Sequence, residues 1–291
     1  MAAPPRNNHS DHDAVSRLSP AEYETFCVFL RERTGLSFTE AKRYYVDRRV
    51  EERMAAVGAG TFRDYLNLLR FQASGEELQL LVNRMTVNET YFFREKYQLD
   101  CLVNSALDEV VQGRSPGERV RIWSAGCATG EEPYSIAIML LEHWRKVDEY
   151  EIELYASDID SHVLNRAREG IYEERALHAL PRGLVAKYFT QIDDQRWQIM
   201  EELRDSIDFS LVNIADPRQV AGFRDFDVIF CRNLLIYFDE LGRRQAASMF
   251  YDALSPCGFI ALGHSESMSR MSSLFVPRRF PDAILYQKPR T

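Results

Sequence analysis

The spacing of hydrophobic residues changes at about residue 118 of the chain. Between residues 19 and 85, apolar side chains recur at the spacing of one face of an amphipathic helix. Four segments there begin with a residue that caps helix N-termini well, namely Ser19, Thr39, Thr61 and Ser74. The pattern therefore predicts a small domain of four short helices over residues 19–85.

Beyond residue 118, short β-rich runs alternate with helical segments. The expected strands are 120–124, 152–157, 208–212, 227–231 and 259–262, and helical patterns cover 134–144 and 241–254. Such alternation is typical of a mostly parallel sheet with helices on both faces. Two further strands, 273–280 and 283–287, are separated by a Pro-Asp turn and predict a closing hairpin. The expected fold class is α/β, with a doubly wound, Rossmann-like domain after the helical one.

Composition narrows the class of protein without naming a function. Of the 291 residues, 45% are hydrophobic and 27% are charged, which suits a globular protein. The formal net charge of −8 disfavours binding to nucleic acid, and no apolar run is long enough to insert into a membrane as a span. Residues 1–18 are polar and predict a disordered tail. They contain no hydrophobic signal core, which predicts a cytoplasmic protein.

The five cysteines are scattered along the chain and form no CxxC pair. This distribution argues against both a disulfide framework and a structural zinc site. We therefore expect reduced thiols that lie mostly in the core, and no bound metal.

The strongest signal of a binding site is the segment 120–134, which runs from a strand through a turn containing Gly126 into a helix. Open α/β sheets bind ligands at this end of a parallel strand. The segment matches neither common phosphate-binding pattern, and Glu131 and Glu132 open its helix. A phosphate would meet like charge there, so the turn favours a cationic or zwitterionic ligand.

The second expected strand ends at Asp158, where an acidic residue commonly accepts hydrogen bonds from ribose hydroxyls. Together with the Gly126 turn, Asp158 indicates an adenosine-type ligand that lacks a pyrophosphate. S-adenosylmethionine has the required ribose, an amino-acid end and a sulfonium charge. Two alternatives stay open, because Asp158 could cap a helix and the glycine turn could join strand to helix without a ligand.

Further polar residues follow the strands that would converge on this edge of the sheet. Asn213 follows the expected strand 208–212, and Arg232 and Asn233 follow the central strand 227–231. Tyr237 comes one helical turn later, although a tyrosine at this position could equally be a core aromatic. The exit of the central strand is where we expect a transferred group.

Five sequence blocks, at 88–94, 130–135, 156–160, 230–238 and 263–267, resemble those of the chemotaxis receptor glutamate methyltransferases, the CheR family. The resemblance covers residues 20–287 and keeps the order of the blocks. It implies a small helical domain joined to a class I methyltransferase domain over residues 101–291. It also implies an enzyme that uses S-adenosylmethionine to form glutamyl methyl esters on bacterial chemoreceptors, leaving S-adenosylhomocysteine.

The resemblance also implies roles for individual residues. A linker over residues 86–100 would close over the cofactor through Asn88, Thr90 and Arg94. Glu132 would hold the amino-acid end and Asp158 the ribose. The adenine and methionine sides would be lined by Asn213, Ile214, Arg232 and Asn233. Arg94 and Tyr237 would flank the methyl acceptor as the catalytic pair.

Methyl transfer to a glutamate carboxylate requires few catalytic groups. A glutamate carboxylate is already anionic near pH 7, so no general base is needed. The methyl transfer requires alignment and exclusion of water, which Arg94 and Tyr237 can serve. Two other functions stay open on the sequence: a methyltransferase of the same fold with another acceptor, and a non-catalytic scaffold that senses the cofactor.

The expected helix after Thr39 carries Lys42, Arg49 and Arg53 on one stripe. On the residues alone, this is as readily a solvated helix face, but the resemblance favours a basic ridge that docks on the helical bundle of a chemoreceptor. Residues 1–18 and 19–85 each have no net charge, so the whole −8 belongs to residues 86–291. Nothing in the sequence demands more than a monomer.

Many members of the resembled family carry a small antiparallel β-subdomain that grips a receptor-tail pentapeptide through a glycine-containing loop. The corresponding region here, at about 186–205, contains no glycine in the segment 188–199 and is short. The subdomain is expected, but we predict an enzyme that works without the pentapeptide.

Overall fold

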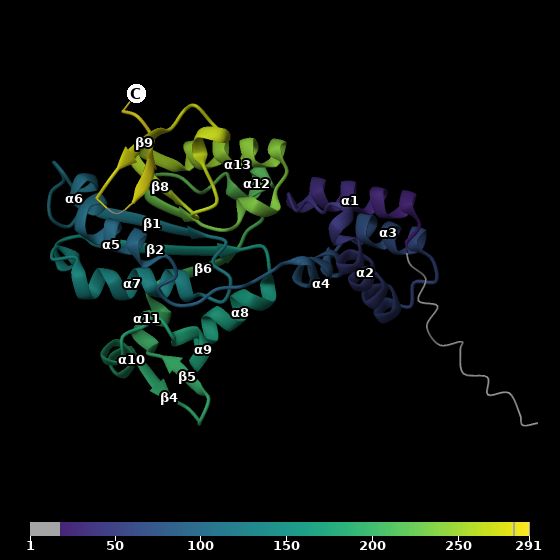
Figure 1. Cartoon of the computed structure of the whole chain (residues 1–291), viewed down its shortest axis with the longest axis horizontal. Coiled ribbons are helices and arrows are strands. Elements are labelled where there is room, and N and C mark those ends of the chain that lie inside the picture. Colours follow the sequence, from purple (N-terminus) through teal and green to yellow (C-terminus); the bar gives the residue numbers. More distant parts are fainter. Residues whose placement is uncertain (1–17, 282, 291) are drawn as a thin grey trace, which may run out of the picture. The chain divides into compact units, whose positions relative to one another are not determined.

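The computed structural model describes residues 18–281 and 283–290, which form two compact units (Figure 1). Among the described residues, one unit contains Leu18–Phe29 together with Phe38–Met85. The other contains Leu30–Ser37, which includes the end of the first helix, and the described chain from Thr86 onward. The predicted disordered tail, apart from Leu18, lies outside the described residues.

The helical unit is built from α1 (Pro20–Thr34), α2 (Arg43–Val57), α3 (Phe62–Phe71) and α4 (Glu76–Met85). Reciprocal capping begins α1, because the Ser19 backbone N–H donates to Glu22 at 2.8 Å and the Glu22 N–H donates to the Ser19 hydroxyl at 3.3 Å. Thr61 likewise accepts from the Asp64 N–H and begins α3. The prediction at Thr39 is displaced, since a 3-10 turn (Glu40–Lys42) precedes α2.

The second unit contains a mixed sheet whose order within the described residues is β6-β2-β1-β7-β8-β10-β9. The parallel strands are β1 (Arg119–Ala125), β2 (Glu151–Asp158), β6 (Ile207–Leu211), β7 (Phe226–Cys231) and β8 (Leu254–Leu262). The predicted hairpin is present as β9 (Val276–Arg279) and β10 (Ile284–Gln287). The chain moves outward from β1 to one side and returns to the other at β7, so the ends of β1 and β7 form a topological switch point.

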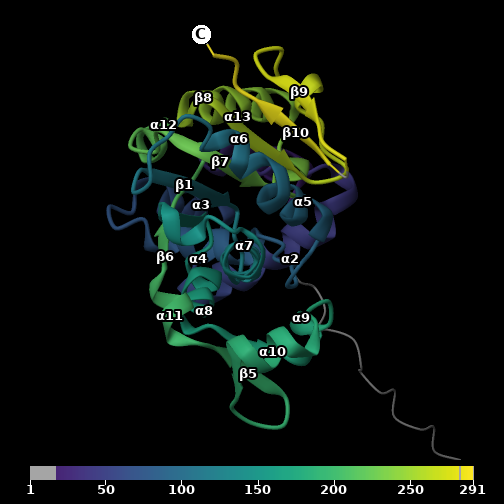
Figure 2. The ribbon, with the colours of Figure 1, turned by 90° about the vertical axis from the view of Figure 1, so that its left-hand side faces the viewer.

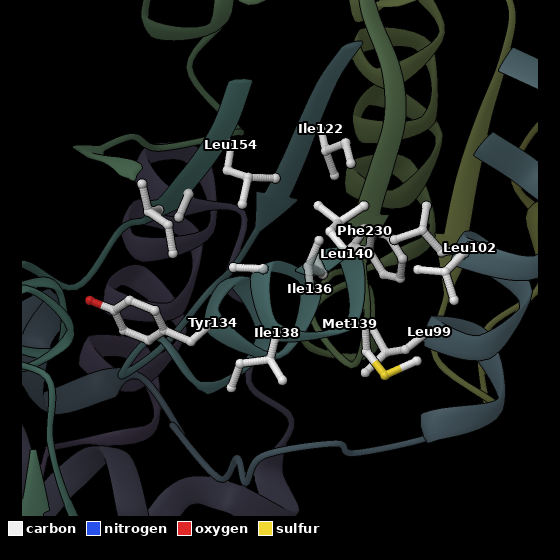
Figure 3. Packing of buried hydrophobic residues seen from close by; sticks show 14 of the residues in the cluster. Leu99, Leu102, Ile122, Tyr134, Ile136, Ile138, Met139, Leu140, Leu154 and Phe230 are labelled. Carbon is white, nitrogen blue, oxygen red and sulfur yellow. The ribbon is translucent and has the colours of Figure 1, made fainter. Parts of the chain in front are cut away.

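Helices cover both faces of this sheet (Figure 2). On one face, α5 (Lys96–Cys101) and α7 (Glu131–His143) pack on the β1 residue Ile122, and Figure 3 shows this cluster with Leu140 and Phe230. On the other face, α13 (Glu240–Ala253) packs on Trp123. Successive residues of β1 thus point into different cores, with Ile122 in one and Trp123 in the other.

A small antiparallel sheet follows the second strand, in the order β3-β5-β4 among the described residues. Its strands are β3 (Ile171–Glu173), β4 (Phe189–Gln191) and β5 (Arg196–Ile199). The β-subdomain expected at about 186–205 therefore starts earlier, because β3 pairs with β5 through Tyr172 and Trp197. A three-residue strand lacks the alternation that would reveal it in the sequence.

Shorter helices complete the unit. They are α6 (Leu107–Val110), α8 (Ser161–Glu169), α9 (Glu174–Leu177), α10 (Arg182–Tyr188), α11 (Glu201–Asp205) and α12 (Pro217–Val220), with a π-helical turn at Leu102–Ala106. In the described parts of the chain, no helix combines the length and apolar character that crossing a membrane requires. All five cysteines lie in these parts and are free.

Candidate functional site

The glycine turn ties the ends of β1 and β2 together. The N–H groups of Gly126 and Cys127 both donate to the Ser157 carbonyl, at 2.8 and 3.0 Å. Gly126 has a φ of +84°, and a Cβ there would lie 2.9 Å from the Leu234 side chain. Both the backbone conformation and the close approach therefore require glycine at this position.

Asp158 lies at the end of β2 and is oriented by this turn. One of its carboxylate oxygens accepts from the Ala128 N–H and the other from the Asp160 N–H, both at 2.9 Å. Burial raises the pKa of Asp158 to about 6. A carboxylate has about four acceptor positions, so two fixed N–H donors leave acceptor capacity for ligand hydroxyls.

The linker is fastened to the same loop through Asp160. One oxygen of Asp160 caps α8, and the other accepts from the Thr86 hydroxyl at 2.6 Å and from the Asn88 amide at 3.0 Å. Asp160 belongs to the sequence block 156–160, but no role was predicted for it. Its signal was an aspartate directly before a helix start, with a second aspartate two residues earlier.

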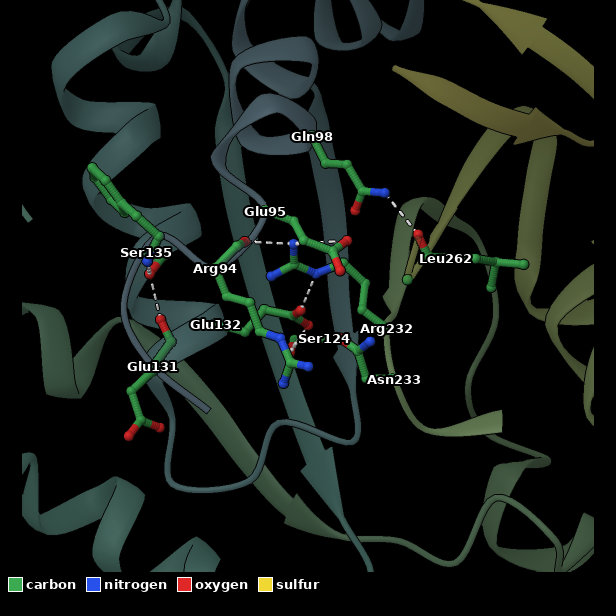
Figure 4. A network of polar contacts seen from close by, with 12 residues as sticks. Arg94, Glu95, Gln98, Ser124, Glu131, Glu132, Ser135, Arg232, Asn233 and Leu262 are labelled. Carbon is green, nitrogen blue, oxygen red and sulfur yellow. Dashed lines mark hydrogen bonds and ion pairs between the residues drawn. The ribbon is translucent and has the colours of Figure 1, made fainter. Parts of the chain in front are cut away.

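Arg232 joins four segments in a buried polar network (Figure 4). Its guanidinium donates to Glu132 at 2.6 Å and to the Arg94 carbonyl at 2.7 Å, and its side chain is 3% exposed. Glu132 also accepts from the Ser124 hydroxyl at 2.7 Å. The ends of β1 and β7, the start of α7 and the linker therefore meet around one charge-assisted ion pair.

Glu131 faces a different partner from Glu132. Its carboxylate accepts from the Thr129 hydroxyl at 2.7 and 2.9 Å, and burial raises its pKa. The structure therefore separates the roles of the two neighbouring glutamates, and only Glu132 belongs to the Arg232 network.

The end of the linker adopts an unusual backbone conformation. Phe93 and Glu95 have φ values of 59° and 51°, in the left-handed region that non-glycine residues rarely adopt. Glu95 accepts from His264 at 2.7 Å, and its other oxygen lies 4.0 Å from Arg232. Burial acts to raise the pKa of Glu95, but the His264 hydrogen bond and the Arg232 charge outweigh it and lower the pKa. These contacts hold the linker in this conformation.

Another left-handed residue, Asn233, is held by Glu266. The Glu266 carboxylate accepts from the N–H groups of Asn233 and Gly263 at 2.9 Å, and from the Ile236 N–H at 3.2 Å. Burial raises the pKa of Glu266. Sequence reasoning missed Glu266, although its presence in the block 263–267 was a signal. It positions the loop that leads to Tyr237.

Arg94 and Tyr237 lie within electrostatic reach of each other. Arg94 donates to the Glu89 carbonyl at 2.6 Å, which directs its guanidinium along the linker. Burial raises the pKa of the half-buried Tyr237, and the positive charge of Arg94 opposes that rise. The charge of Arg94 thus acts on the Tyr237 hydroxyl, and a catalytic role for the two residues stays a prediction.

Two cysteines lie in the walls of the site. Cys127 belongs to the glycine turn and Cys231 ends β7, and both are buried. Burial raises the pKa of each thiol well above its ordinary value. The nearby carboxylates of Asp158 for Cys127 and of Glu266 for Cys231 act in the same direction. Both side chains are therefore protonated thiols at neutral pH.

Comparison with known protein families shows to which family the chain belongs. Residues 88–282 match the CheR methyltransferase SAM binding domain, and residues 21–86 match the CheR methyltransferase all-alpha domain. The chain belongs to the CheR methyltransferase family. This confirms the family and the fold class predicted from the sequence, and S-adenosylmethionine as the cofactor.

Curated CheR relatives match over nearly the whole chain. "Chemotaxis protein methyltransferase 2" of Vibrio cholerae is 47% identical over 272 residues, covering 94% of each chain. "Chemotaxis protein methyltransferase" of Borreliella burgdorferi is 36% identical and covers 88% of each chain. The protein of that name from Salmonella typhimurium is 35% identical, covering 87% of this chain and 86% of the relative.

The residues of this CheR domain fit the cofactor chemically. Asp158 supplies a fixed carboxylate for ribose hydroxyls, and the nearby acidic pair of Glu131 and Glu132 disfavours a polyphosphate. Glu132 and Arg232 together offer both charges that an amino-acid end requires. This donor set suits a ligand with a ribose and a zwitterionic end.

Three predicted cofactor residues show no direct sign of binding. The Asn213 amide donates to the Arg33 carbonyl at 2.6 Å and its oxygen accepts from the Ala215 N–H at 3.0 Å. The Ile214 side chain is buried, whereas Thr90 is half-buried. Asn213 thus has a local structural role in this CheR protein, and its contact with adenine stays a prediction.

The basic ridge predicted on α2 is only partly available. Arg53 donates to Glu77 at 2.5 and 3.0 Å, in an ion pair whose acid is 3% exposed. Arg49 donates to the Arg84 carbonyl at 2.5 Å, whereas Lys42 is exposed. Arg53 is thus paired with an acidic residue of α4, which face analysis of one helix cannot reveal, and the docking of this ridge on a receptor stays a prediction.

Proposed function

We propose that this protein transfers the methyl group of S-adenosylmethionine to glutamate side chains of bacterial chemoreceptors, forming methyl esters during sensory adaptation. The observation that carries the proposal is the fixed Asp158 carboxylate at the end of β2 together with the buried Glu132–Arg232 ion pair, in a chain of the CheR family. The names of the curated relatives support a chemotactic role. The acceptor is the cytoplasmic helical bundle of the receptor, and the enzyme acts as a cytoplasmic monomer.

The cofactor supplies a methyl group activated by its positively charged sulfur. Asp158 holds the ribose, and Glu132 with Arg232 holds the amino-acid end beside the Gly126 turn. Asn88, Thr90 and Arg94 close the linker over it, supported by the hydrogen bond from Asn88 to Asp160. Asn213, Ile214 and Asn233 line the remaining sides.

The residues of the acceptor side orient a group that needs no activation. The pKa of glutamate is about 4.3, so its carboxylate is ionised at neutral pH and requires no general base. Arg94 aligns that carboxylate by a charge-assisted hydrogen bond. The Tyr237 hydroxyl, which has no hydrogen-bond partner within the described residues, is free to donate to the acceptor and to exclude water.

We propose that the enzyme does not depend on a receptor-tail pentapeptide. The turn between β4 and β5 is closed by Asp193, which accepts from the N–H groups of Gln195 at 3.0 Å and Arg196 at 2.8 Å. This turn is therefore closed by an aspartate and contains no glycine, which supports the proposal. Micromolar binding of a receptor-tail peptide in calorimetry would contradict this part of the proposal.

The function is tested by incubating the protein with radiolabelled S-adenosylmethionine and receptor-containing membranes. Base-labile methyl groups on receptor glutamates support the proposal, because esters hydrolyse in base. Base-stable label on another protein or small molecule would identify a different methyltransferase. Cofactor binding without any transfer would indicate a non-catalytic sensor.

A further inference from the structure

A cavity of about 390 Å³ lies beside the loop that carries Tyr237. Its lining includes the apolar Ile236 and Met271 and the polar Arg243, Ser265 and Arg270. Ile236 directly precedes Tyr237, so the cavity opens one residue from the proposed acceptor position. None of the roles described above uses this cavity.

The charged residues of the cavity lining are two arginines, Arg243 and Arg270, and two glutamates, Glu240 and Glu266. Among the ion pairs between described residues, none joins Arg243 or Arg270 to a carboxylate, and Arg243 donates only to the Leu235 carbonyl at 2.9 Å. The two acidic residues of the lining are already engaged. Glu240 pairs with Arg244 at 2.6 Å, and Glu266 accepts from backbone N–H groups.

The two arginines of the cavity differ in charge from the rest of residues 86–291. Residues 86–291 carry the whole net charge of −8, yet two unpaired arginines meet here. The exposed Arg270 and the Ser265 hydroxyl offer donors in this lining, and Ile236 is 43% exposed beside them. An acidic side chain with an aliphatic stem would find charge, hydrogen-bond donors and an apolar contact together.

We propose that this cavity binds a second acidic side chain of the acceptor protein, on the helical turn next to the methylated glutamate. This inference rests on the proposed function, because it needs a helical acceptor at Tyr237. Residues three or four apart on an α-helix lie on the same face, about one 5.4 Å turn apart. The cavity then selects which glutamates of an acceptor helix are methylated.

The test is steady-state methylation of a soluble receptor cytoplasmic fragment by the full-length protein and its variants. Arg270→Glu is expected to raise the KM for the fragment about tenfold, because it replaces attraction by repulsion. Its kcat and its affinity for S-adenosylmethionine should stay within about twofold of wild type, since Arg270 is exposed. Arg270→Lys keeps the charge and should retain most of the affinity for the fragment.

Arg279→Glu serves as the matched control, because it makes the same charge change at an exposed position on β9, outside the cavity lining. A fragment whose acidic residue next to the methylation site is replaced by arginine should restore the KM of Arg270→Glu. Equal KM values for wild type and Arg270→Glu would overturn the cavity assignment and leave the proposed function intact. If the wild-type protein labelled no receptor glutamate, both the cavity assignment and the proposed function would be overturned.

Discussion

The two sides of the site are built differently. On the cofactor side, Gly126 and Asp158 are held by backbone N–H groups at the ends of neighbouring strands. On the acceptor side, Glu95 and Asn233 adopt left-handed conformations without being glycine. Side chains of His264, Arg232 and Glu266 hold them there. We therefore expect cofactor binding to depend on the sheet and methyl transfer to depend on a few ionic contacts.

The largest effect is expected where the two sides meet, at Arg232. Arg232→Met leaves Glu132 buried without its cation, and we expect a loss of about 3–5 kcal/mol in the free energy of unfolding. Urea denaturation without cofactor measures this loss. Arg244→Met, which removes an exposed pair with Glu240, should cost less than about 1 kcal/mol. Similar losses for both variants would show that the buried network stabilises the fold no more than an exposed ion pair does.

The cofactor side should respond to pH through Asp158. Its pKa is about 6 in the folded protein against 3.8 ordinarily, so it becomes protonated as the pH falls through 6. Affinity for S-adenosylmethionine should therefore fall below pH 6, because a protonated Asp158 accepts fewer hydrogen bonds from the ribose. The raised pKa of Asp158 changes the stability of the fold in the opposite direction. The protonated carboxyl contributes fully to the free energy of unfolding below pH 3.8, and this contribution is lost as the pH rises through 6.

Calorimetric titration between pH 5 and pH 8 measures this dependence at constant ionic strength. Asp158→Asn should lower the affinity at pH 8 about tenfold or more and abolish the pH dependence. Asp205→Asn, at an exposed position of α11, provides the control. If Asp158→Asn bound the cofactor as tightly as wild type, the ribose assignment would be wrong.

Substitutions on the acceptor side should lower the rate of methyl transfer more than they lower the affinity for S-adenosylmethionine. Glu266→Gln replaces one acceptor oxygen by a donor that faces backbone N–H groups, so the loop leading to Tyr237 loses its support. We expect kcat to fall about tenfold and melting to shift downward, as for a lost hydrogen bond of 1–3 kcal/mol. The control is Glu202→Gln on α11, which is exposed. An unchanged kcat would remove Glu266 from the positioning residues.

The smallest effect is expected at His264, whose side chain is 69% exposed. His264→Gln removes one contact to Glu95 but leaves Arg232 in place, so kcat should fall only about twofold. Single-turnover methylation measures the change, with His162→Gln as an exposed control. A loss as large as that of Glu266→Gln would mean that His264 acts on more than the linker conformation.

The elements that could be predicted were those with a local cause. The helix start at Ser19 and the strand at 120–124 each depend on a few consecutive residues, and both predictions were confirmed. The Arg53–Glu77 pair joins residues from two helices, and the support of Asn233 comes from Glu266. Such contacts depend on how distant segments pack, and a spacing pattern does not reveal them. The left-handed linker residues were also missed, because no glycine marks them.

The thiols of Cys127 and Cys231 are possible targets of methylation by the cofactor itself. S-adenosylmethionine is an alkylating agent, and a thiolate is among the strongest nucleophiles in proteins. Cys127 and Cys231 are buried beside carboxylates, which keeps both as thiols. The same negative surroundings that suit a sulfonium thus protect the protein from methylating itself.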